Sequence, residues 1–114
     1  MSCIFCQIVS GEVKNDILYQ DDDVLAFRDI QPQAPVHILI IPKKHISSLN
    51  EVTEIEMPML GKLTAVATQM AAKEGIAEKG YRTIINCGPE GGQAVSHLHM
   101  HLLGGRQLSR FEHG

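Results

Sequence analysis

Three of the six histidines in the chain, His97, His99 and His101, alternate with apolar residues in the segment HLHMHLL. Alternate residues of a β-strand point to one face, so a strand here predicts three imidazoles in one row, with the apolar residues in the core. Neighbouring histidines would lie about 6.6 Å apart and the outer two about 13 Å apart. An H-x-H pair can share a metal ion, but three on one strand reach a single ion only at full stretch. A catalytic surface is easier to build, and a strand whose polar face happens to be histidine is the alternative.

The glycine-rich segment GPEGG at 88–92 stands shortly before these histidines. Such a loop offers free backbone N–H groups and is suited to hold an anion. An imidazole, whose pKa is ordinarily near 6.5, serves at physiological pH either as a neutral nucleophile or as a charged partner of phosphate. Histidines beside an N–H-rich loop indicate phosphorus chemistry.

Five strands and one long helix are predicted to position these residues. The strand-like runs are ILYQ (17–20), VLAFR (24–28), VHILII (36–41), RTIINC (82–87) and HLHMHLL (97–103). The polar break DDD is short enough for a hairpin between the first two runs, and Pro42 should end the third. This order favours an α+β domain on a mostly antiparallel sheet, and the 114 residues are expected to form a single domain, 1–114.

The helix is predicted over residues 54–74, where one apolar stripe runs at spacings of four, three and four. The stripe consists of Met59, Leu63, Val66 and Met70. Gly75 is a reasonable terminator. The start is open, because Thr53 and Glu56 could form a capping box, whereas Pro58 would remove a helical hydrogen bond and favours a later start.

Composition narrows the class of protein. The net charge of −3 argues against a general nucleic-acid binder, because the phosphate backbone is bound mainly through an excess of lysine and arginine. The sequence contains no apolar stretch of the roughly eighteen residues that a membrane span needs, and its first residues do not resemble a secretory signal. Three cysteines, an odd number, fit a reducing compartment, so a cytoplasmic protein is expected.

Cys3 and Cys6 form a C-x-x-C motif that has three interpretations. It is a redox-active pair, two small residues in an apolar segment, or half of a zinc site, which needs about four nitrogen or sulfur ligands. Cys87 is one candidate for a further ligand.

The chain resembles the histidine triad (HIT) superfamily in three blocks that occur in the family's order. HLHMHLL matches the His-x-His-x-His-x-x pattern, and the blocks CIFCQIVSGEV, VLAFRDIQPQAPVHILIIPKKHI and GGQAVSHLHMHLLGGRQL resemble the branch of bacterial nucleoside phosphoramidate hydrolases. The resemblance implies a five-stranded antiparallel sheet with one long helix and short helices, paired as a homodimer whose sheets join. It also implies an AMP-type purine nucleotide ligand and cleavage at the α-phosphorus, without an organic cofactor.

The resemblance also assigns roles to individual residues. His99 would be the nucleophile that forms a nucleotidyl-histidine intermediate, and His101 would hydrogen-bond a phosphate oxygen and stabilise its charge. Asp29 would bind the ribose hydroxyls, and His37 would support the same site. The remaining nucleotide-binding residues would be Phe5, Ile8, Phe27, Ile30 and Leu39 around the base, and Asn86, Gly92, Gln93 and Ala94 around the phosphate. Phe27 and Leu39 alternate within strands and could equally be ordinary core, and Asp29 could be a turn-capping residue.

In relatives with the C-x-x-C motif, the resemblance implies a structural zinc ion bound by Cys3, Cys6, His45 and His97. Such Cys₂His₂ ligation closes the coordination sphere, so His97 would be a ligand and not an acid or base. His113 is expected at the surface.

Two departures from the family concern the leaving group. Ala94 stands where many relatives have a serine thought to assist protonation of the leaving group, and Ser96 is expected to point elsewhere. The C-terminal segment RQLSRFEHG also lacks the tryptophan that closes the site in some relatives. Two alternatives stand beside phosphoramidate hydrolysis: hydrolysis of dinucleoside polyphosphates, and a zinc-containing nucleotide-binding protein with little turnover.

Overall fold

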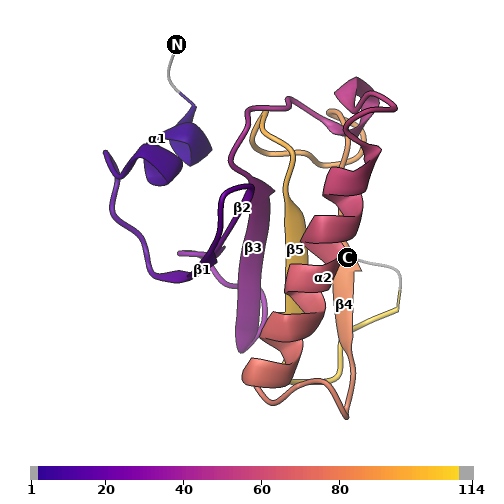
Figure 1. The fold of residues 1–114 in the computed structure, drawn as a ribbon. Helices are drawn as coiled ribbons and strands as arrows, with labels where there is room; N and C mark the ends of the chain where they lie inside the picture. The colour runs from indigo at the N-terminus through magenta and orange to yellow at the C-terminus, as the bar shows by residue number, and fades with distance from the viewer. Residues whose placement is uncertain (1–2, 111–114) are drawn as a thin grey trace.

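The structure is a computed structural model that describes residues 3–110 (Figure 1). Its elements in chain order are α1 (Ile4–Ser10), β1 (Ile17–Gln20), β2 (Val24–Arg28), β3 (Val36–Pro42), the 3₁₀ turn η1 (Leu49–Glu51), α2 (Met57–Lys73), β4 (Tyr81–Ile84) and β5 (Met100–Gly104). No helix within residues 3–110 is long and apolar enough to cross a membrane.

The five strands form one antiparallel sheet in the order β1-β2-β3-β5-β4. The predicted α+β class and antiparallel sheet are therefore confirmed. In the register of the central pair, Leu39 lies opposite His101 and His37 lies opposite Leu103. His37 and His101 consequently sit diagonally across two neighbouring strands, within reach of each other on the same face of the sheet.

The two helices pack on opposite faces of the sheet. On one face, α2 buries its apolar stripe against side chains such as Ile38, Ile40 and Leu102. On the other face, Phe5 and Ile8 of α1 pack against the opposite side of β2 and β3. Because both faces of the central strands are covered, β3 is buried along its whole length, which explains its nearly continuous apolar sequence.

The start of α2 combines the two possibilities that the sequence left open. Thr53 and Glu56 form the capping box, since the Glu56 carboxylate accepts from the Thr53 backbone N–H and the Thr53 hydroxyl accepts from the Glu56 N–H. The regular helix begins only at Met57, with Pro58 in its first turn, where a missing N–H leaves no hydrogen bond unmade. Gly75 follows the helix with φ of +76°.

The last strand is shorter than the sequence pattern predicts, because β5 begins at Met100 and leaves His97 and His99 outside it. The register explains this boundary: continuing the pairs beyond Ile40 and Met100 would place Leu98 opposite Pro42, which has no N–H to donate. The Leu98 N–H donates instead to the carbonyl oxygen of Ile46 at 2.6 Å. The predicted strand 82–87 is likewise shorter and ends at Ile84.

Candidate active site and metal centre

The alternation of side chains nevertheless continues through the irregular segment. Leu98 belongs to the core beneath α2, whereas His97 and His99 both contact the ring of Phe5 on the opposite face. The three histidines thus lie on the face that α1 covers in part. This placement agrees with the prediction of a histidine-bearing face, although only His101 lies within a strand.

The hydrogen bonding of His99 leaves one of its ring nitrogens available. Its Nδ1 lies 2.7 Å from the carbonyl oxygen of His97, which can only accept, so Nδ1 carries the proton and donates it. A neutral imidazole then has its lone pair on Nε2. Burial lowers the pKa of His99, against a smaller opposing effect of the carbonyl bond, and so favours this neutral form. His99 therefore has the electronic form of a nucleophile.

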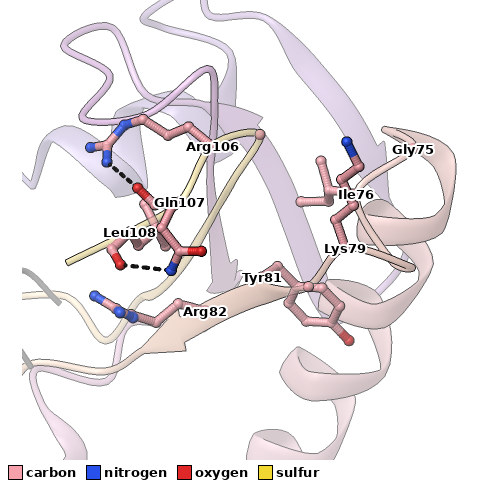
Figure 2. A pocket seen from close by; sticks show the side chains of 10 residues that line it. Gly75, Ile76, Lys79, Tyr81, Arg82, Arg106, Gln107 and Leu108 are labelled. Atoms are coloured by element: carbon pink, nitrogen blue, oxygen red, sulfur yellow. Dashed lines mark hydrogen bonds between the residues drawn. The ribbon is translucent and has the colours of Figure 1, made fainter. Parts of the chain in front are cut away.

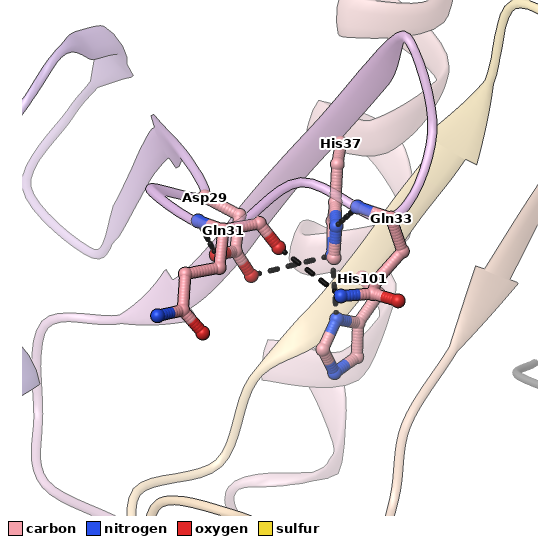
Figure 3. A network of polar contacts seen from close by, with 5 residues as sticks. All are labelled: Asp29, Gln31, Gln33, His37 and His101. Carbon is pink, nitrogen blue, oxygen red and sulfur yellow. Dashed lines mark hydrogen bonds and ion pairs between the residues drawn. The ribbon is translucent and has the colours of Figure 1, made fainter.

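His101 lies next to His37 and Asp29 (Figure 3). Its Nδ1 is 2.9 Å from His37 Nε2, which is itself 3.4 Å from a carboxylate oxygen of Asp29. Burial lowers the pKa of His101 to about 4, with the positive forms of His99 and His37 adding to the effect. His101 is consequently neutral at pH 7 and can act as a hydrogen-bond donor only through the nitrogen that bears its proton.

An open pocket of about 380 Å³ lies beside His101. Its lining residues are Gln33, His37, Ile84, Asn86, Gly91, Gly92, His101 and Leu103. Four predicted nucleotide-binding residues are therefore brought to one cavity from β3, β5 and the loop after β4. None of the described residues that line it is a lysine or an arginine, so its donors are neutral amides and imidazoles.

The loop between β4 and the histidines is organised by Gln93 and by its own turns. The Gln93 carboxamide accepts from the Gly88 N–H at 2.9 Å and donates to the carbonyl oxygens of Ser47 and Val95. The backbone N–H groups of Gly92 and Gln93 donate to carbonyl oxygens within the same loop. Asn86 donates to the Gly91 carbonyl, and Ala94 is exposed at the end of the loop.

The residues predicted to surround the base occupy two environments. Phe5, Ile8, Phe27 and Leu39 belong to one buried cluster, in which the Phe5 and Phe27 rings meet edge to face with centroids 5.5 Å apart. Ile30, in contrast, is 83% exposed beside Asp29. Contact of these five side chains with a base stays a prediction, although Ile30 is the one that is freely accessible.

The four predicted metal ligands, Cys3, Cys6, His45 and His97, converge on one point. Their ligand atoms all lie within 4.8 Å of one another, and the group could hold a metal ion. His97 Nδ1 is 3.4 Å from Cys3 Sγ and 3.6 Å from Cys6 Sγ, and His45 Nδ1 is 3.3 Å from Cys6 Sγ. A tetrahedral zinc ion with ordinary bond lengths separates its sulfur and nitrogen ligands by about 3.5 Å. The spacing therefore fits such an ion.

The surroundings of His97 favour metal ligation through Nδ1. His97 is fully buried, and its Nε2 donates to the carbonyl oxygen of Pro42 at 2.9 Å, which leaves the lone pair on Nδ1 directed at the cysteines. This arrangement of a metal-ligating histidine held by a carbonyl is common around zinc. Burial raises the pKa of the Cys6 thiol, so a bound cation would have to displace its proton. Cys87 is not part of the cluster.

Two contributors to the site were not anticipated from the sequence. The Gln33 backbone N–H donates to His37 Nδ1, and the Pro42 carbonyl orients His97. Backbone groups of this kind cannot be recognised from residue types. The sequence shows only that Gln33 and His37 lie close together in a proline-rich loop. The predicted surface position of His113 lies outside the described residues.

A second, larger pocket of about 740 Å³ lies between the α2–β4 connection and the segment after β5 (Figure 2). Lys79, Arg82 and Arg106 contribute to its lining, and the Arg106 guanidinium donates to the carbonyl oxygens of Gln107 and Gln33. None of the predicted site residues lines this pocket. His37 and His101 line the smaller pocket, and the ring of the candidate nucleophile His99 lies next to it, with its centroid 5.0 Å from that of His101.

Fold and site together define an α+β protein with a cluster of histidines and a glycine-rich loop on the face of an antiparallel sheet that α1 covers in part. The sequence profile of the HIT domain matches residues 10–108. The chain therefore belongs to the HIT family.

Relatives support this assignment over most of the chain. A purine nucleoside phosphoramidase of Escherichia coli K12 is 55% identical over 105 residues, which cover 92% of this chain and 88% of that protein. The crystal structure of a HIT family hydrolase from Legionella pneumophila superposes with a TM-score of 0.93 at 47% identity, covering 96% of this chain and 97% of its own. A histidine triad protein from Clostridium difficile has a TM-score of 0.95 at 46% identity, covering 98% and 97% of the two chains.

Proposed function

We propose that this protein hydrolyses purine nucleoside 5′-phosphoramidates through a nucleotidyl-histidine intermediate on His99. The observation that carries the proposal is the bond from His99 Nδ1 to the His97 carbonyl, which directs the Nε2 lone pair to an incoming phosphorus. The name and the 55% identity of the Escherichia coli relative support the choice of substrate.

In the proposed reaction, His99 Nε2 forms a bond to the α-phosphorus while the bond from phosphorus to the amine breaks. The amine takes the electron pair and gains a proton to leave as a neutral molecule. Water then attacks the phosphorus, the bond to Nε2 breaks, and the nucleoside monophosphate is released. Deprotonation of the attacking water and protonation of the amine balance over the complete cycle.

The other residues of the site are proposed to bind the substrate. His101 donates from Nε2 to a phosphate oxygen, and Asn86 contributes its amide at the same pocket. Asp29 accepts from the ribose hydroxyls, and the exposed Ile30 beside it contacts the base. The buried residues Phe5, Ile8, Phe27 and Leu39 form the wall behind the base, and Gly92, Gln93 and Ala94 shape the phosphate loop.

The neutral lining of the pocket favours an amine over a polyphosphate as leaving group. A dinucleoside polyphosphate carries further negatively charged phosphates, which proteins usually bind through lysine or arginine side chains. The described lining residues offer neither. Because Ala94 has no hydroxyl, the proton for the leaving amine must come from another donor or from water.

The test is turnover of adenosine 5′-monophosphoramidate by the wild-type protein and by His99→Asn. We expect the variant to lose at least a thousandfold in kcat, because the covalent route is gone. Thr64→Val, a change on the exposed side of α2, is the matched control and should retain wild-type activity.

The intermediate is measured separately, by acid-quenching the wild-type reaction and determining the protein mass by mass spectrometry. A mass increase equal to one adenylyl group that maps to His99 is expected. Equal turnover by wild type and His99→Asn would refute the proposal. Nucleotide binding without turnover or adduct would favour the zinc-containing nucleotide-binding protein instead.

Zinc is proposed as the ion at Cys3, Cys6, His45 and His97, because two thiolates and two imidazoles match its preferred ligands. The ion would have a structural role. Its four protein ligands leave no open coordination position, and they join the start of α1, the segment after β3 and the segment before β5. All three cysteines are free thiols, and such ligands persist in a reducing compartment, which supports the expected cytoplasmic location.

A homodimer is also proposed, with β4 at the joint. β4 is an edge strand of the sheet, so its outer backbone groups can pair with the same strand of a second chain. Nothing in the charge or composition favours nucleic acid as a further partner.

A further inference from the structure

Asp29, His37 and His101 form a second cluster whose ligand atoms lie within 4.8 Å of one another. Two imidazoles and a carboxylate are a donor set that binds transition metals. The same three groups could instead form a chain of hydrogen bonds. The proton positions that the surrounding backbone imposes distinguish these two arrangements.

The proton position on His37 follows from its contact with Gln33. The Gln33 backbone N–H donates to His37 Nδ1 at 3.0 Å, so that nitrogen must present its lone pair. Arg106 bonds the Gln33 carbonyl at 2.8 Å and holds this residue in place. A neutral His37 therefore carries its proton on Nε2. With a proton there, Nε2 has no lone pair for a metal ion.

The same reasoning extends to His101. The nearest acceptor for the His37 Nε2 proton is His101 Nδ1 at 2.9 Å, while the Asp29 oxygen lies farther away, at 3.4 Å. His101 Nδ1 then accepts, and the proton of a neutral His101 must be on Nε2. Nε2 is the nitrogen that is left to meet a ligand.

We propose that His37 is a positioning residue. The Gln33 N–H fixes the proton of His37 on Nε2, and His37 in turn fixes the proton of His101 on Nε2. A neutral His101 can then donate that proton in a hydrogen bond to the substrate phosphate. The statement that the acceptor is a substrate phosphate rests on the proposed function. The chain of donors runs from the backbone of the loop before β3, through His37, to His101 (Figure 3).

Neutral donation suits the position of these residues. His37 is 5% exposed and His99 is 4% exposed, so a permanent positive charge on His101 beside them would be costly. The Gln31 N–H donates to Asp29 Oδ1 at 2.8 Å, and the other carboxylate oxygen, Oδ2, lies 3.4 Å from His37 Nε2, farther than His101 Nδ1.

Nitrogen-15 NMR of the imidazoles in the ligand-free protein at pH 7 tests the proton positions directly. We expect Nδ1 to be the unprotonated nitrogen in both His37 and His101. In His37→Leu, which removes the donor, the His101 signals should shift towards a mixture of the two tautomers. In His37→Gln, whose amide can donate in place of Nε2, the His101 signals should stay close to those of the wild type.

Turnover of adenosine 5′-monophosphoramidate provides the functional readout. His37→Leu should lower kcat about tenfold, as expected for one lost neutral hydrogen bond, and His37→Gln should recover most of that loss. Gln31→Leu is the control, because the exposed Gln31 side chain points away from the two imidazoles (Figure 3) and should leave kcat unchanged.

Three results would overturn the proposal. The first is a wild-type spectrum in which Nδ1 of either His37 or His101 carries the proton. The second is a loss of kcat in His37→Leu with unchanged His101 signals. The third is a second zinc ion in wild-type protein that is absent from His37→Leu, measured by native mass spectrometry. If the wild type has no turnover, the proposed function fails, while the spectrum still decides the proton positions.

Discussion

Each histidine at this site is specified by what its second ring nitrogen contacts. The Pro42 carbonyl orients His97 towards the cysteines, and the His97 carbonyl orients His99. The contact of His101 is of the opposite kind, because its Nδ1 lies 2.9 Å from the ring nitrogen Nε2 of His37, which is proposed to donate. The three histidines therefore differ in the ring nitrogen that is left free: Nδ1 in His97, and Nε2 in His99 and His101.

The depressed pKa of His101 predicts a pH dependence of stability. Burial and the neighbouring His99 and His37 lower this pKa from 6.5 to about 4, with Asp29 opposing them. Between these two values the unfolded chain binds more protons than the folded one, so stability falls as pH falls from 6.5 towards 4. The loss attributable to His101 should reach about 2 to 3 kcal/mol and level off below pH 4.

Urea unfolding of wild type and His101→Gln at pH 7.5, 6.0, 5.0 and 4.0 measures this effect. The difference in unfolding free energy between the two proteins should change across the window in favour of the variant. Any acid-induced release of a metal is common to both proteins and cancels in the comparison. A difference that is independent of pH would contradict the assigned pKa.

At the scale of elements, the site depends on a turn that leaves no room for a side chain at Gly91. The loop from Gly88 to Gln93 is closed by hydrogen bonds among its own backbone groups. A Cβ added at Gly91 would lie 2.3 Å from the Cys87 carbonyl oxygen, so the two atoms would overlap and the backbone would have to shift. Gly61 in α2 has open space around it.

Alanine at these two glycines should have opposite effects. Gly91→Ala must distort the loop beside Asn86, so we expect it to weaken AMP binding at least tenfold and to lower stability by about 1 to 3 kcal/mol. Gly61→Ala should raise stability by about 0.5 to 1 kcal/mol without affecting AMP binding, because alanine favours the helix. Calorimetric titration with AMP and thermal unfolding measure both quantities, and wild-type affinity in Gly91→Ala would exclude this role of the loop.

At the scale of the whole molecule, the cysteine–histidine cluster joins three segments that are distant in the sequence. Cys3 and Cys6 belong to the start of α1, His45 follows β3, and His97 precedes β5. Because Phe5 of α1 packs against His97 and His99, the same cluster also holds Phe5 in its position beside His99. Loss of the metal should therefore affect both stability and ligand binding.

Removal of zinc by a chelator should lower the free energy of unfolding by about 3 kcal/mol or more, as expected when free zinc exceeds its dissociation constant a hundredfold. Cys6→Ser should behave as the chelated protein, with AMP affinity reduced. Cys87→Ser, which changes the cysteine outside the cluster, should keep one zinc ion per chain and wild-type stability. Metal analysis and thermal unfolding check this, and a zinc content that is unchanged in Cys6→Ser would rule out the proposed ligands.

Much of the fold could be predicted because its signals are local. The strands at 17–20 and 24–28 and the stripe of α2 follow from the periods of strand and helix, which neighbouring residues express by themselves. The ends of β4 and β5 could not be predicted this way. For β5, pairing with β3 continues only where β3 can donate, and Pro42, about sixty residues earlier, is the residue that stops it.

The sequence by itself determined the row of three histidines, the glycine-rich loop and the C-x-x-C motif, and its resemblance to the HIT family implied a role for each of them. Only the tertiary structure decided how they are divided. It brought His45 and His97 to the cysteines and left Cys87 out, and it gave His97 and His99 a carbonyl acceptor for the proton of one ring nitrogen. These assignments depend on carbonyl and N–H groups contributed by remote backbone, and every residue has those groups, so residue types carry no trace of them.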